Sequence, residues 1–504
     1  MIIDAHMHFP LEGDAKAAAD AMVTALDAAG INLGIVSDLA DDWSEYPTTE
    51  QICKANERAA AAVSCHMDRL RYLAYISPRL ENALDEIDKN RNRPGCVGLK
   101  LWISLRDESG TLEPTRRVLA RAAQYDIPVM IHAFNRSDDL LKGEIDSAEF
   151  AELAREFPNL TFVCAHLTVN AAENAATFPK ELPRTYGDIA GGDPDYGCVE
   201  LLCNRLGSNR LLFGSDGLGR SLLSQLAKVI TADLTEEERK AILYQNALAV
   251  YRIDPASIGD VHANTSNIPA EYPDPAEDHF LMTGRRFDGQ PGGTEVEELE
   301  NLLAASAISR AYAAPMEAIF SNALSEINRT YAERARKLRI LKILAAINPT
   351  ARSWRDDLRI AQELNAPGLW LSPYLHNYQL DAEQFSEFFA ECEKIGMSLW
   401  INCGFYDFRF RFRNAVFRPV ATEEILALSR RHPTLPIVYQ NAAEIETLLE
   451  AGIPEIQKFD IAFVIDGEGR LAKLVKRFGV KQLVFGSAYP LRRLNTTRYA
   501  AGIR

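Results

Sequence analysis

Short apolar runs alternate with amphipathic stretches throughout residues 1–252. Each run carries consecutive residues such as Val, Ile, Leu or Phe, which is typical of a parallel strand buried on both faces. The alternation predicts eight βα units and therefore a (β/α)8 TIM barrel, with a doubly wound open sheet as the alternative. The predicted strands are 2–8, 31–38, 70–77, 96–103, 127–133, 160–167, 184–190 and 210–216.

A second series of strands follows a break in this pattern. Residues 253–279 contain Pro269, Pro273 and Pro275 and lack helical periodicity, which predicts a linker. The alternation then resumes, so we expect a second barrel over residues 280–504. Its predicted strands are 280–287, 310–316, 338–347, 367–373, 397–403, 435–441, 459–465 and 481–487.

Short segments of the first half return in the second half at a spacing of about 270 residues. Leu-Ala-Tyr-Ile-Ser-Pro at 73–78 returns as Leu-Ala-Ala-Ile-Asn-Pro at 344–349. Leu-Phe-Gly-Ser at 212–215 returns as Val-Phe-Gly-Ser at 484–487. A constant spacing indicates internal duplication. The sequence therefore predicts tandem barrels, of which the second is a copy of the first.

Five side chains that can bind or serve a metal ion lie at the ends of predicted strands in the first half. They are His6, His8, His132, His166 and Asp216. The carboxyl ends of barrel strands meet on one face, and two histidines at i and i+2 point to the same side of a strand. Three histidines and a carboxylate, with one further histidine, suit a catalytic divalent ion that keeps an open position. A single histidine could be structural and Asp216 could be a helix cap, but the set favours a metal site.

The second half lacks this set. Alignment on the repeated segments places Asn402, Asn441 and Ala488 opposite His132, His166 and Asp216. His6 and His8 then meet roughly Arg285 and Phe287. Asparagine and alanine cannot replace a neutral imidazole or a carboxylate on zinc. We therefore expect a degenerate second barrel that binds no metal.

These motifs resemble the amidohydrolase superfamily, in particular the amidohydrolase 2 group, which includes aminocarboxymuconate-semialdehyde decarboxylase and related lactonases. The shared features are the Asp-Ala-His-Met-His opening, single histidines on the fifth and sixth strands, and Phe-Gly-Ser-Asp on the eighth. The resemblance implies that His6, His8, His132 and Asp216 bind one divalent ion. It also implies that Asp216 handles the proton of the activated water and that His166 orients and polarises the substrate.

Three functions remain open at this stage. The first is hydrolysis of a C–O or C–N bond in a lactone or cyclic amide, in which metal-activated water attacks a carbonyl group and His166 supports the developing oxyanion. The second is non-oxidative decarboxylation of a small unsaturated or aromatic acid by the same residues. The third is a non-catalytic binding or structural role. Zn²⁺ is the expected ion, although the same ligands suit Mn²⁺ and Fe²⁺.

Further strand-end residues are candidates for binding the substrate. Lys100 could be a carboxylated lysine bridging two metals, a cation for a substrate carboxylate, or a surface lysine with its stem along the protein. Arg136 could pair bidentately with an anionic group. Trp102 and Tyr186 lie on or just past the ends of predicted strands, where loops set specificity.

The net charge of −15 argues against nucleic acid or an anionic membrane surface as the main partner, but it says nothing positive about the substrate. The predicted metal site leads us to expect a small-molecule substrate. The amino terminus has no basic start followed by an apolar segment, and the eight cysteines form no CxxC pair. These features predict a cytoplasmic setting. We expect the two barrels to pack within the chain, and a homo-oligomer remains open.

Overall fold

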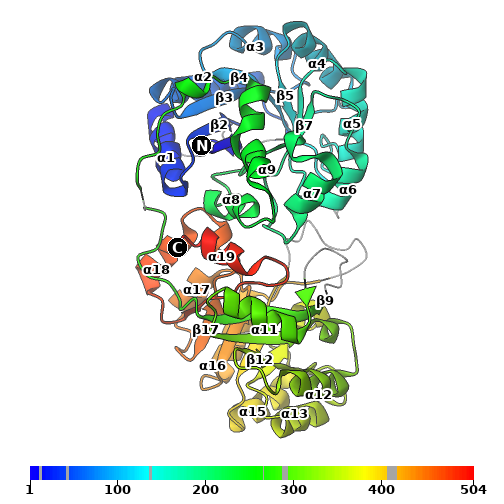
Figure 1. The fold of residues 1–504 in the computed structure, drawn as a ribbon, viewed down its shortest axis with the longest axis vertical. Coiled ribbons are helices and arrows are strands. Elements are labelled where there is room, and N and C mark those ends of the chain that lie inside the picture. The colour runs from blue at the N-terminus through cyan, green and yellow to red at the C-terminus, as the bar shows by residue number, and fades with distance from the viewer. Residues whose placement is uncertain are drawn as a thin grey trace. The chain divides into compact units, whose positions relative to one another are not determined.

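The computed structural model describes residues 1–10, 14–40, 45–135, 139–264, 266–285, 293–405 and 417–503. The chain forms two compact units (Figure 1). The first contains Met1–Pro194 and Cys198–Asn267, and the second contains Asp195–Gly197 and most of the chain from Ile268 onward. Among the described residues, no helix is long and apolar enough to cross a membrane.

The first unit is a nearly closed parallel barrel of eight strands in the order of the sequence. Its seam lies between the first and last strands, where Ala5 N donates to Phe213 O (2.9 Å) and Asp216 N donates to His6 O (2.8 Å). This arrangement confirms the predicted barrel and excludes the open sheet. The strands are β1 (Ile3–His8), β2 (Leu33–Ser37), β3 (Leu70–Ile76), β4 (Cys96–Leu101), β5 (Val129–Ile131), β6 (Phe162–Cys164), β7 (Thr185–Asp188) and β8 (Leu211–Leu212).

Helices follow the strands and lie around them in Figure 1. Their ends have local causes: Thr48 and Gln51 form a capping box at the start of α2, and Gly30 ends α1 with a φ of 75°. The helices are α1 (Ala15–Ala29), α2 (Thr49–Cys65), α3 (Ala83–Asn90), α4 (Glu113–Tyr125), α5 (Ser147–Glu156), α6 (Ala171–Thr177), α7 (Cys198–Leu206), α8 (Leu222–Ile230), α9 (Glu236–Lys240) and α10 (Asn246–Tyr251).

The second unit contains a four-stranded sheet in the order β10-β9-β11-β12 and a six-stranded sheet in the order β13 to β18. All paired strands are parallel except β9 and β10. The strands are β9 (Glu277–Arg285), β10 (Gly293–Thr294), β11 (Arg310–Pro315), β12 (Leu341–Ile343), β13 (Ala345–Ala346), β14 (Leu369–Leu371), β15 (Leu399–Asn402), β16 (Ile437–Gln440), β17 (Gln457–Asp460) and β18 (Leu483–Val484).

The helices of the second unit again follow its strands. They are α11 (Val296–Ala305), α12 (Leu324–Ala335), α13 (Trp354–Glu363), α14 (Pro373–His376), α15 (Ser386–Lys394), α16 (Thr422–Arg431), α17 (Ile445–Glu450), α18 (Arg470–Phe478) and α19 (Leu494–Ala500). The first strand, β9, begins at Glu277 inside the predicted linker, because the proline-rich segment ends at Pro275 and β9 pairs with β11 from Glu277 onward.

One buried carboxylate in each unit makes the same pair of backbone contacts. Asp4 Oδ1 accepts from His6 N (3.2 Å) and Ser215 N (3.0 Å). Asp278 Oδ1 accepts from the backbone N of Phe280 (3.1 Å) and of Ser487 (3.0 Å). In each case Oδ2 has no hydrogen-bond partner among the described residues. Each carboxylate therefore holds the first strand of its unit against the segment that follows the last one.

This matched geometry corrects the register expected for the second unit. Ala488 N donates to Phe280 O as Asp216 N donates to His6 O, so His6 corresponds to Phe280 and His8 to Met282. The expected pairing with Arg285 and Phe287 is wrong, because it assumed a first strand at 280–287 whereas β9 begins at Glu277.

Burial raises the pKa of Asp278 to about 7. An unfolded aspartate titrates near 4, so between about pH 4 and 7 the folded chain holds a proton that the unfolded chain has lost. The stability of the second unit should therefore fall as the pH rises through this window, by at most about 1.4 kcal/mol per pH unit from this group. Asp278→Asn should remove this contribution to the slope of the unfolding free energy against pH.

The measurement is urea denaturation at several pH values, followed by the fluorescence of Trp370 and Trp400, which are buried in the second unit. Asp356→Asn, at an exposed aspartate of α13, is the control and should keep the wild-type slope. An Asp278→Asn variant with the wild-type slope would contradict the prediction.

Candidate metal centre

Three of the predicted ligands meet at the seam of the first barrel. His6 and His8 lie on β1 and are buried, and both side chains are on the same side of the strand. Asp216 follows β8 in a left-handed conformation with a φ of 61°, and its backbone N bonds to His6 O. The closure of the barrel therefore brings together residues that are 210 positions apart in the sequence.

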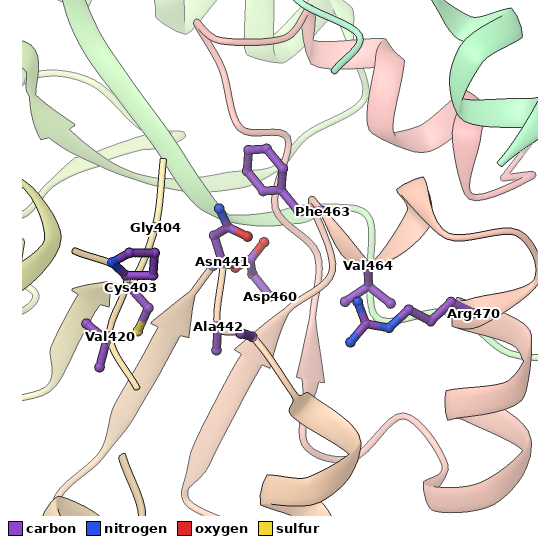
Figure 2. A pocket seen from close by; sticks show the side chains of 11 residues that line it. Cys403, Gly404, Val420, Asn441, Ala442, Asp460, Phe463, Val464 and Arg470 are labelled. Atoms are coloured by element: carbon purple, nitrogen blue, oxygen red, sulfur yellow. Dashed lines mark hydrogen bonds between the residues drawn. The ribbon is translucent and has the colours of Figure 1, made fainter. Parts of the chain in front are cut away.

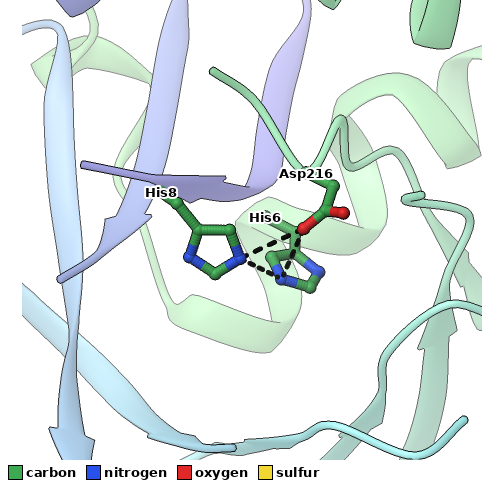
Figure 3. Close-up of side chains that lie close together, drawn as sticks. All are labelled: His6, His8 and Asp216. Atoms are coloured by element: carbon green, nitrogen blue, oxygen red, sulfur yellow. Dashed lines mark hydrogen bonds and ion pairs between the residues drawn. The ribbon is translucent and has the colours of Figure 1, made fainter. Parts of the chain in front are cut away.

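Ligand atoms of these three side chains converge (Figure 3). The His6 Nε2 and His8 Nε2 atoms are 3.2 Å apart. Asp216 Oδ1 lies 3.1 Å from His8 Nε2 and 3.9 Å from His6 Nε2. The side chain of Asp216 is 26% exposed, so this carboxylate can be reached from outside the barrel.

The Nδ1 atoms of His6 and His8 contact other groups. His6 Nδ1 lies 2.8 Å from Asp188 Oδ2, and His8 Nδ1 lies 3.1 Å from Ser37 Oγ. Because a carboxylate only accepts, His6 Nδ1 carries the proton. A proton on His8 Nδ1 likewise suits the carbonyl O of Ser37, which only accepts and lies 3.4 Å away. Both Nε2 atoms then carry lone pairs and lie within 3.9 Å of Asp216 Oδ1. Two imidazole nitrogens and a carboxylate oxygen, with the far side of each ring held in place, are a donor set that suits a divalent ion.

Burial also keeps these groups in the ionisation state that ligation requires. It lowers the pKa of His6 to about 4, and the nearby Lys100 adds to this effect. Burial acts to raise the pKa of Asp216, but its contact with His8 and the other neighbouring imidazoles hold it well below its usual value. The two groups are thus a neutral imidazole and an ionised carboxylate at neutral pH.

Asp188 is a site residue for which the sequence indicated only a place near a strand end. One oxygen contacts His6, and the other accepts from His166 N (2.8 Å) and Ala190 N (3.0 Å). The sequence feature that could have drawn attention to Asp188 is the return of Asp188-Ile189-Ala190 as Asp460-Ile461-Ala462. Asp188 orients one metal-ligand candidate and the backbone of His166 at once.

His166 lies beside His6, with ring centroids 5.0 Å apart. Its Nδ1 donates to Ala190 O (3.2 Å), which leaves the lone pair on Nε2. Burial lowers the pKa of His166 well below its usual value. At neutral pH this residue is therefore a hydrogen-bond acceptor at Nε2.

His132 stands apart from the group of three. Its ring centroid is 5.0 Å from that of His166, and its Nε2 lies 2.8 Å from Oε1 of the buried Glu144. No sequence pattern pointed to Glu144, since it follows β5 in a loop and meets His132 only in the folded barrel. The role of His132 as a ligand stays a prediction.

Lys100 is fully buried, with 0% exposure, so the interpretation as a surface lysine is wrong. Its position on β4 points the side chain into the barrel, where Nζ lies 2.8 Å from His6 Nε2. Burial lowers the pKa of the Lys100 amine to about 8, against the opposing charges of Asp188 and Asp216. The bridging role and the substrate-binding role both remain open.

The other substrate-binding candidates are placed less centrally. Trp102 packs against the apolar cluster of Leu39, Ile52 and Tyr75. The Tyr186 ring lies 6.0 Å from the guanidinium of Arg210, which precedes β8, so it points away from the carboxyl ends of the strands. Arg136 lies outside the described residues.

The amidohydrolase family model matches residues 3–253. A search of curated proteins gave no match. Similar solved structures include a 2,6-dihydroxybenzoate decarboxylase from Rhizobium, with 19% identity over 50% of this chain and 98% of that chain and a TM-score of 0.39.

Two further solved structures are similar to about half of this chain. A 4-oxalomesaconate hydratase from Rhodopseudomonas palustris has 16% identity over 50% of this chain and 96% of that chain, with a TM-score of 0.38. A 5-carboxyvanillate decarboxylase from Novosphingobium aromaticivorans, with bound manganese, has 14% identity over 48% and 82%, with a TM-score of 0.37. None of these likenesses identifies the reaction of this chain. The family match extends over the whole of the first barrel, and through that unit the chain belongs to the amidohydrolase family of enzymes.

Proposed function

We propose that the first unit is a metal-dependent hydrolase that opens a C–O or C–N bond in a small polar substrate such as a lactone or cyclic amide. The observation that carries this proposal is the convergence of His6 Nε2, His8 Nε2 and Asp216 Oδ1. His6, His8 and Asp216 would hold one divalent ion, with His132 as the further ligand implied by the family resemblance. Zn²⁺ is the proposed ion, and Mn²⁺ or Fe²⁺ would also suit these ligands.

A divalent ion in such a site supplies Lewis-acid polarisation and makes water reactive at neutral pH. Asp216, ionised and partly exposed, takes a proton from the attacking water and passes it to the leaving oxygen or nitrogen. The neutral His166 accepts a hydrogen bond at Nε2 and so orients that water. This acceptor role fits the geometry better than the expected support of an oxyanion, which needs a donor.

The second candidate is non-oxidative decarboxylation of a small unsaturated or aromatic acid. Asp216 would then take a proton from water and pass it to the carbon that loses carbon dioxide. Its position beside the two histidines serves both reactions, so the structure alone does not favour one. Measuring carbon dioxide release and ring opening across a panel of acids and lactones separates them.

For the second unit we propose a role that involves no metal ion. Among the described residues, both groups of ligand atoms close enough to hold an ion lie in the first unit. The second unit instead has an open pocket of about 220 Å³ lined by Asn441, Asp460, Phe463 and Arg470 among others (Figure 2). Asn441 N donates to Asp460 Oδ2 (2.5 Å), and this bond matches the one from His166 N to Asp188 in the first unit. We infer that this unit is a duplicate that kept the scaffold and lost the ligands.

The third candidate is a non-catalytic binding or structural role. Retained folding and metal binding without activity against any acid, lactone or cyclic amide would support that role.

Metal content tests the central proposal. Protein purified without chelator or added metal should contain about one divalent ion per chain by inductively coupled plasma mass spectrometry. His8→Ala should lose the ion, because it removes one of the converging Nε2 atoms. His432→Ala is the matched control, since His432 is a buried histidine of the second unit that bonds to Glu393 (2.8 Å). Absence of metal even after reconstitution would refute the proposal.

Lys100→Met separates the two remaining roles of Lys100. With a single ion in the wild type, the variant should keep that ion and weaken binding of an acidic substrate, seen as a higher KM. A wild type with two ions that falls to one in Lys100→Met would assign the bridging role instead.

His166→Gln should keep the ion and lose activity. Because general acid–base and water-orienting groups contribute typically 10²- to 10⁴-fold, kcat/KM should fall by roughly that factor. Metal content and activity are measured on the same preparation. Loss of the ion in His166→Gln would show that His166 is a ligand and not a catalytic residue.

A further inference from the structure

Helix α8 buries two long polar side chains in a mostly apolar sequence. Gln225 is 0% exposed and Lys228 is 4% exposed. They are three positions apart and so project from the same face of the helix. Burial of an ammonium group is costly unless the group is hydrogen-bonded. Their presence in an apolar helix therefore needs a structural or functional reason.

Both side chains donate to the segments that follow β6 and β7. Lys228 Nζ contacts Thr168 Oγ1 (3.2 Å), Ile189 O (3.0 Å) and Gly191 O. Gln225 Nε2 donates to Gly192 O (3.0 Å). The backbone of residues 189–192 is thus held from α8 at three carbonyl groups.

The fourth carbonyl in this segment, Ala190 O, accepts from His166 Nδ1 (3.2 Å). The turn also passes very close to the ring. Gly191 has a φ of 68°, and a Cβ there would lie 2.8 Å from His166 Nδ1. Only glycine fits this approach. The ring of His166 is therefore positioned by a backbone turn that α8 holds in place.

We propose that Lys228 and Gln225 are positioning residues that keep Ala190 O against His166 Nδ1 and so fix the proton of the imidazole on Nδ1. The lone pair then stays on Nε2. The nitrogen that carries the proton is set by the partner of the ring. The inference rests on the proposed function only where it assigns His166 a part in the chemistry, because the tautomer itself can be observed without turnover.

The test is long-range ¹H–¹⁵N correlation NMR on the full chain, labelled with [¹⁵N]histidine and loaded with Zn²⁺. His166→Gln assigns the His166 signals by their loss. The wild type should show His166 protonated at Nδ1. Lys228→Met, which keeps the length of the side chain without the donors, should shift the tautomer ratio towards Nε2–H by roughly three- to tenfold, the worth of one hydrogen bond.

Three variants make this result interpretable. Lys240→Met removes an exposed lysine of α9 and should leave the His166 signals unchanged. Lys228→Arg keeps a buried cation with donors and should restore most of the Nδ1–H form, which a loss of packing alone would not explain. Gln225→Leu should shift the ratio in the same direction by a smaller factor, and it carries the test if Lys228→Met does not fold.

The proposal is overturned if the wild type is protonated at Nε2. It is also overturned if folded, Zn²⁺-loaded Lys228→Met or Gln225→Leu keeps the wild-type ratio. Neither outcome depends on finding a substrate, and metal content by mass spectrometry on the same samples reports separately on the proposed metal site.

Discussion

The hydrogen-bonded seam between the start and the end of the first barrel is the constraint on which its site depends. Asp4 accepts from His6 N and Ser215 N, and His6 O accepts from Asp216 N. These bonds cross between β1 and the segment after β8, which are adjacent only when the barrel closes. The same bonds that close the sheet therefore set the distance between two histidines and a carboxylate. A ligand set built on backbone hydrogen bonds is rigid before any ion arrives.

Burial then gives each side chain its chemical state. Apolar surroundings disfavour the charged form of His6 and His166, so both remain neutral. Asp216 stays ionised because hydrogen bonding and its neighbours outweigh the cost of burial. Asp188, Ser37 and the turn at Ala190 decide which ring nitrogen carries each proton. The outer groups are thus as much a part of the site as the ligand candidates.

The second unit has counterparts of the buried carboxylates of the first unit but not of its ligand candidates. Asp278 makes the contacts of Asp4, and Asp460 bonds to Asn441 N and Ala462 N as Asp188 bonds to His166 N and Ala190 N. The residues at the ligand positions are Phe280, Met282 and Ala488, none of which suits a divalent ion. The buried carboxylates therefore serve the closure and strand-end turns of either unit, whereas the histidines and Asp216 serve the first unit alone.

The sequence by itself determined the alternation of strands and helices, because buried parallel strands and amphipathic helices have periodicities that can be read locally. It also determined that His6, His8, His166 and Asp216 end strands, and for a barrel this implies a common face. Tertiary structure alone decided the rest. Glu144, Lys228 and Gln225 lie in a loop and in a helix whose local sequence shows no motif, and they reach His132 and the 189–192 turn only through folding. The register of β9 was likewise misplaced by sequence, since a strand start is set by pairing with its neighbour rather than by composition.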